Sequence, residues 1–73
     1  MAYDRAVKYL ESEDLLDKKV SVKNIAVRDD ICLFFFAKDR TDYGRLRDTW
    51  DRIVKGENIT YYEALRTFKD KLS

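Results

Sequence analysis

One cysteine and four aspartates are the side chains in this sequence best suited to chemistry. Cys32 is the only cysteine, and it lies in the apolar run Ile31–Ala37, where burial raises the pKa of a thiol and makes it inert. The chain has no histidine to serve as a general base. The four aspartates flank this run without the spacing or the glycine of a calcium loop, and we assign Asp29, Asp30, Asp39 and Asp42 to turns and helix caps. The sequence therefore predicts a protein that is not an enzyme, with no catalytic residue, metal site or cofactor.

The run Ile31–Ala37 is the most apolar stretch of the chain, and its short length is more typical of a strand than of a helix. In a strand, Phe34 and Phe36 would point to one face and Phe35 to the other. Both faces would be apolar, and a domain of 73 residues seldom has enough chain to cover both. We therefore expect a partner, either another protein or a second copy of this chain, to cover part of the run.

Two tyrosines extend this predicted interface. Tyr9 and Tyr62 fall outside the apolar stripes of the helices predicted below, so each is expected either to be exposed or to lean over the rim of the core. Tyrosine is enriched at protein interfaces because it combines a large apolar ring with a polar tip. The predicted partner-binding residues are Phe34, Phe35, Phe36, Tyr9 and Tyr62.

A basic segment gives an alternative function, which is nucleic-acid binding. Its cations are Lys18, Lys19, Lys23 and Arg28, and such side chains contact phosphates in proteins of that class. The formal net charge of the whole chain is only +1, from 15 basic and 14 acidic residues. A balance of this kind provides no global field that attracts nucleic acid, so we place this alternative second.

The pattern of the first half predicts an α+β fold. Tyr3, Ala6, Val7 and Leu10 have the spacing of a short amphipathic helix. Residues 20–27 are rich in β-formers, and we expect them to pair with residues 31–38 as a small antiparallel hairpin that turns at residues 28–30. The alternative is an all-α bundle, in which Ser21 caps one short helix and Asp29 or Asp30 caps another through the phenylalanines.

The last third of the chain predicts two helices packed on this hairpin. The first runs from Thr41 or Asp42 to Lys55, and Gly56 follows at the position of a left-handed C-cap. The second begins with the capping box Thr60–Glu63. Their apolar stripes consist of Tyr43, Leu46, Trp50, Ile53 and Val54 on the first helix and of Tyr61, Ala64, Leu65, Phe68 and Leu72 on the second. We expect Trp50 and Phe68 to meet at the interface of these helices.

Taken together, these features predict one small domain over residues 1–73. The first residues carry no apolar signal segment and no run is long enough to span a bilayer, so we expect a cytoplasmic protein without membrane contact. The predicted function is that of a non-enzymatic protein-binding module, an accessory regulator or inhibitor of a larger enzyme or complex. Small phage-like regulators of the transcription machinery are one example of this class.

Overall fold

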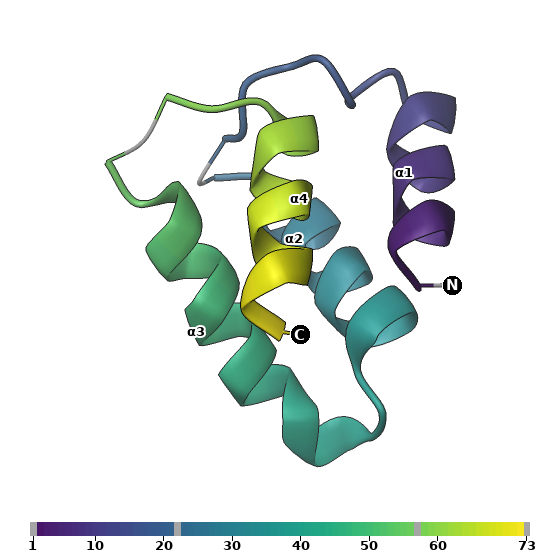
Figure 1. The fold of residues 1–73 in the computed structure, drawn as a ribbon, viewed down its shortest axis with the longest axis vertical. Helices are drawn as coiled ribbons and strands as arrows, with labels where there is room; N and C mark the ends of the chain where they lie inside the picture. The colour runs from purple at the N-terminus through teal and green to yellow at the C-terminus, as the bar shows by residue number, and fades with distance from the viewer. Residues whose placement is uncertain (1, 22, 57, 73) are drawn as a thin grey trace.

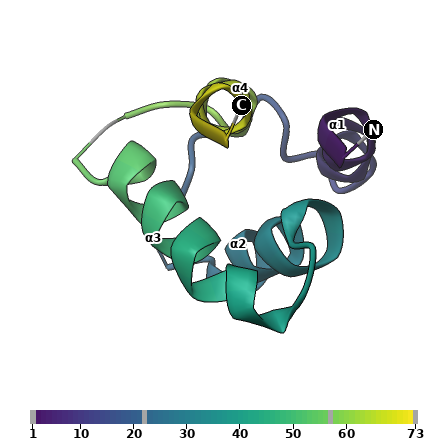
Figure 2. The same cartoon turned by 60° about the horizontal axis from the view of Figure 1, so that its bottom comes forward.

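The structure is a computed structural model that describes residues 2–21, 23–56 and 58–72. Its helical segments are α1 (Ala2–Ser12), α2 (Ile25–Asp30), the π-helical segment η1 (Ile31–Phe36), the short 3-10 segment η2 (Arg40–Asp42), α3 (Tyr43–Val54) and α4 (Tyr61–Leu72). Figures 1 and 2 show α1, the continuous segment α2–η1, α3 and α4 arranged around a shared core. In the described ranges, the sheet-type pairing is one isolated antiparallel bridge between Lys19 and Thr60, which ties the loop after α1 to the start of α4.

The predicted hairpin is wrong, and with it the α+β fold, because residues 25–36 form one continuous helix and the described residues make an all-α bundle. The helix begins after Asn24, whose side-chain oxygen accepts a hydrogen bond from the backbone nitrogen of Val27 at 3.4 Å. The all-α alternative expected a cap at Ser21 and a new helix at Asp29 or Asp30. Both aspartates instead lie inside the helix, and Val22, which belonged to the predicted strand, lies outside the described residues.

The phenylalanine run is helical because a π turn aligns its aromatic side chains with the core. The backbone nitrogen of Ala37 donates to the carbonyl of Cys32 at 2.9 Å, which is the five-residue spacing of a π turn. Residues four apart lie on the same face of a helix, one above the other. Phe35 thus follows Ile31 and Phe36 follows Cys32 along one inner face, on which Ile31 and Cys32 are fully buried.

Asp29 and Asp30 hold this helix between its two neighbours. Asp29 accepts a hydrogen bond from the hydroxyl of Tyr43 on α3 at 2.5 Å, and Asp30 accepts one from the hydroxyl of Tyr9 on α1 at 2.7 Å. The Tyr43 hydroxyl, followed by the guanidinium of Arg28, lowers the pKa of Asp29 below its usual value. Adjacent aspartates on a helix point in different directions, so one pair of residues links α2 to both α1 and α3.

The predictions for α3 and α4 are confirmed in their main features. Trp50 and Phe68 pack edge to face with ring centroids 5.5 Å apart, and Leu46 is buried beside them. Gly56 adopts a φ of 69°, in the left-handed region that glycine enters without steric cost. The start of α3 differs from the prediction, because it begins at Tyr43 after Asp42, whose side chain makes no capping hydrogen bond.

The capping box at the start of α4 is also confirmed. The backbone nitrogen of Glu63 donates to the hydroxyl of Thr60 at 3.2 Å, and the backbone nitrogen of Thr60 donates to the carboxylate of Glu63 at 3.3 Å. These reciprocal bonds satisfy donors at the helix start that have no partner within the helix. The start of α4 fixes the position of Tyr61 in the core and of its neighbour Tyr62 on the surface.

Tyr61 and Tyr9 differ in whether the hydroxyl has a hydrogen-bond partner, and this difference gives a test of the core. Within the described residues the buried hydroxyl of Tyr61 has no hydrogen-bond partner, whereas that of Tyr9 donates to Asp30. We expect Tyr61→Phe to raise the free energy of unfolding by about 1 kcal/mol, because it removes an unsatisfied polar group. We expect Tyr9→Phe to lower it by about 1 kcal/mol, because it removes a satisfied one. Urea denaturation of both variants measures these changes, and an equal loss in the two would show that the Tyr61 hydroxyl is satisfied.

Candidate protein-binding surface

Leu33 and Phe34 form an exposed apolar pair in the helix α2–η1. Phe34 is 70% exposed and Leu33 is 40% exposed, whereas Ile31 and Cys32 directly before them are fully buried. The π turn that directs Phe35 and Phe36 inward leaves Leu33 and Phe34 on the opposite side of the helix. We call these two residues the exposed ridge. Ile25, at the other end of the same helix, is also 54% exposed.

The other two phenylalanines of the predicted interface are partly buried and pack within the domain. Phe35 packs against Tyr9 of α1 with ring centroids 5.4 Å apart, and the guanidinium of Arg5 lies 5.6 Å from the Phe35 ring centroid. Phe36 packs edge to face on Phe68 of α4 at 5.0 Å. Of the three phenylalanines, Phe34 is therefore the one that has its ring available to a partner.

Tyr9 takes part in the packing between α1 and η1, so of its two expected positions it has the one at the rim of the core. Its side chain is half-buried, with its ring against Phe35 and its hydroxyl on Asp30. Burial, together with this hydrogen bond, raises the pKa of Tyr9 to about 12. These contacts occupy both the apolar and the polar part of the side chain, so Tyr9 contributes to folding.

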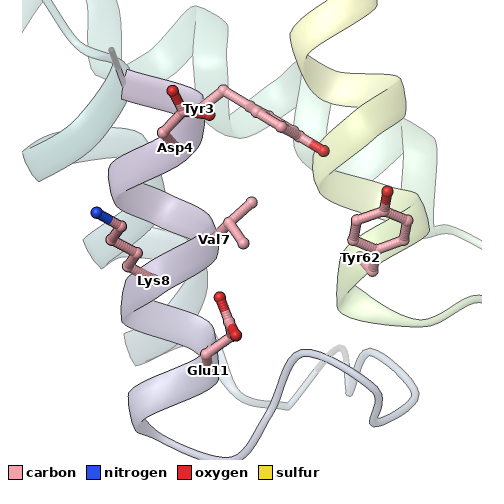
Figure 3. Close-up of a pocket in the computed structure, with 6 residues that line it drawn as sticks. All are labelled: Tyr3, Asp4, Val7, Lys8, Glu11 and Tyr62. Atoms are coloured by element: carbon pink, nitrogen blue, oxygen red, sulfur yellow. The ribbon is translucent and has the colours of Figure 1, made fainter.

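Tyr62 is 41% exposed, but it lies on a second surface, a groove of about 440 Å³ between α1 and α4. Figure 3 shows Tyr3 extending from α1 toward α4, Tyr62 pointing toward it from α4, and Val7 further along α1 on the side that faces α4. Burial raises the pKa of the Tyr3 hydroxyl, and the charge and hydrogen bonding of Tyr62 raise it further. We call this the tyrosine groove; it is lined by Tyr3, Asp4, Val7, Lys8, Glu11 and Tyr62.

The four cations of the basic segment do not form one open patch. Arg28 is held by ion pairs to Asp29 at 3.1 Å and to Asp51 at 3.3 Å, and its side chain is only 19% exposed. The ammonium of Lys19 donates to the backbone carbonyl of Asn58 at 2.9 Å. Lys18 and Lys23 are exposed in the loop between α1 and α2.

Cys32 is placed as the sequence predicted, within the core, and burial raises the pKa of its thiol to about 12. A thiol in this state is a poor nucleophile near neutral pH because only the thiolate reacts. Among residues 2–21, 23–56 and 58–72, no group of three or more histidine, cysteine, aspartate or glutamate side chains is placed to hold a metal ion.

Sequence reasoning missed Leu33, Tyr3 and Val7 as surface residues. A strand would put Leu33 on the same face as Phe35, whereas the helix exposes Leu33 and packs Phe35. Tyr3 and Val7 were assigned to the buried stripe of the first helix, and they do lie on its inner side, but the space between α1 and α4 leaves them at the wall of a groove. The spacing of Tyr3 and Val7 predicts that they share one face of the first helix. It does not predict the groove, because the groove depends on where α4 lies beside α1.

Comparisons with protein-family models, with curated proteins and with solved structures gave no match for this chain. The helices in the described part of the chain all fall short of the length and apolar character needed to cross a membrane.

Proposed function

We propose that this chain is a non-enzymatic module that binds another protein through the exposed ridge of Leu33 and Phe34. The observation that carries this proposal is the 70% exposure of Phe34 in a helix whose other aromatic side chains are packed. Burying a phenylalanine side chain stabilises an association by about 1.5–3 kcal/mol. An exposed aromatic beside a second exposed apolar residue is therefore a suitable centre for an interface.

Within this proposal, the chain acts in the cytoplasm as an accessory regulator or inhibitor of a larger enzyme or complex, of which transcription machinery is one example. A small domain that presents Phe34 on the surface of a helix suits a role in which a larger partner supplies the pocket. The identity of the captured partner tests the regulatory part of the proposal separately from the binding part.

Nucleic-acid binding receives less support from the geometry. Arg28 is paired with Asp29 and Asp51, and the ammonium of Lys19 donates to the backbone carbonyl of Asn58. Among the described residues of the basic segment, Lys18 and Lys23 are those whose side chains make no hydrogen bond or ion pair. Several phosphate contacts would make binding fall steeply as salt rises, by roughly 10³ or more for six contacts. Binding through the exposed ridge should change little over the same range of salt.

Capture from nuclease-treated lysate of the source cell, with the immobilised protein as bait, tests this function. Replacing Phe34 with serine should reduce the amount of specifically captured protein at least about tenfold, because the largest contact of the interface is lost. The matched control is Tyr62→Ser, which removes an exposed aromatic from the tyrosine groove and should leave capture through the ridge unchanged.

Two results would count against the ridge. Capture that is equal for the parent and Phe34→Ser would show that Phe34 is not at the interface. Loss of the captured material on nuclease treatment would point to nucleic acid and away from a protein partner. Sedimentation of the purified chain, with and without Phe34→Ser, distinguishes self-association from binding of a different protein.

A further inference from the structure

We draw no further inference here: the strongest candidate, the hollow between α3 and α4 that is lined by Thr49, Arg52 and Lys71, has both of its cations on exposed side chains, and nothing in the structure of the described residues shows what would occupy it.

Discussion

Replacing Trp50 with alanine is expected to cost about 3–5 kcal/mol of folding free energy. Trp50 is 2% exposed, packs edge to face with Phe68 at 5.5 Å and stacks near Tyr61 at 6.5 Å. Its removal leaves a cavity between α3 and α4 that these neighbours cannot fill without moving. A domain of 73 residues has a total stability of only about 4–11 kcal/mol, so the variant should be largely unfolded in moderate urea or at elevated temperature.

Urea denaturation followed by far-ultraviolet circular dichroism measures this loss without depending on tryptophan fluorescence. Tyr62→Ala is the matched control, because it also removes an aromatic side chain but from a surface position that is 41% exposed. The control should change stability by no more than about 1.5 kcal/mol, because it loses a partly exposed ring and a hydrogen bond with Tyr3. A Trp50→Ala protein with the denaturation midpoint of the parent would show that the packing of α3 on α4 does not hold the domain together.

The C-terminal half of the fold could be predicted from the sequence because its local signals agree with one another. The capping box at Thr60, the glycine at position 56 and two regular apolar stripes all indicated the same two helices. The contact of Trp50 with Phe68 followed from those stripes and is confirmed. Where the capping residues, the apolar periodicity and the helix-ending glycine all indicate the same helix, its presence can be predicted without knowing the tertiary packing.

The segment from Val20 to Ala37 could not be predicted in this way, because the length of its apolar run favours a strand while its periodicity does not separate a strand from a buried helix. The decisive features are long-range contacts. The hydroxyl of Tyr9 donates to Asp30 and that of Tyr43 donates to Asp29. Both aspartates were expected in a turn, and both lie within the helix α2–η1. No local pattern predicts that these two aspartates lie within a helix, because aspartate favours turns and helix caps over helix interiors.

The candidate binding surface was predicted only in part, for the same reason. The sequence pointed to the phenylalanine run through a strand that the structure does not contain, and in the helix Phe34 is the exposed member of the run. Which of the three phenylalanines faces solvent depends on the helical register and on the π turn, and both depend on packing against α1 and α4. The tyrosine groove needs the position of α4 beside α1, which no spacing within either helix specifies.

The second large effect is the contrast between two serine substitutions in this run. Phe36→Ser should cost about 2–4 kcal/mol, because Phe36 packs on Phe68 with ring centroids 5.0 Å apart. Phe34→Ser should change the free energy of unfolding by no more than about 0.5 kcal/mol, because its ring is 70% exposed. The two variants carry the same chemical change two residues apart, so differences in residue type cannot account for the contrast.

Measuring the unfolding free energies of Phe34→Ser and Phe36→Ser side by side in urea is the most direct test of the helix that presents the exposed ridge. In a strand these two side chains would share a face, and the two variants would lose similar amounts of stability. In the helix α2–η1 one faces solvent and the other the core. A large loss for Phe36→Ser beside a near-parental Phe34→Ser is the predicted result, and equal losses would contradict both the helix and the ridge.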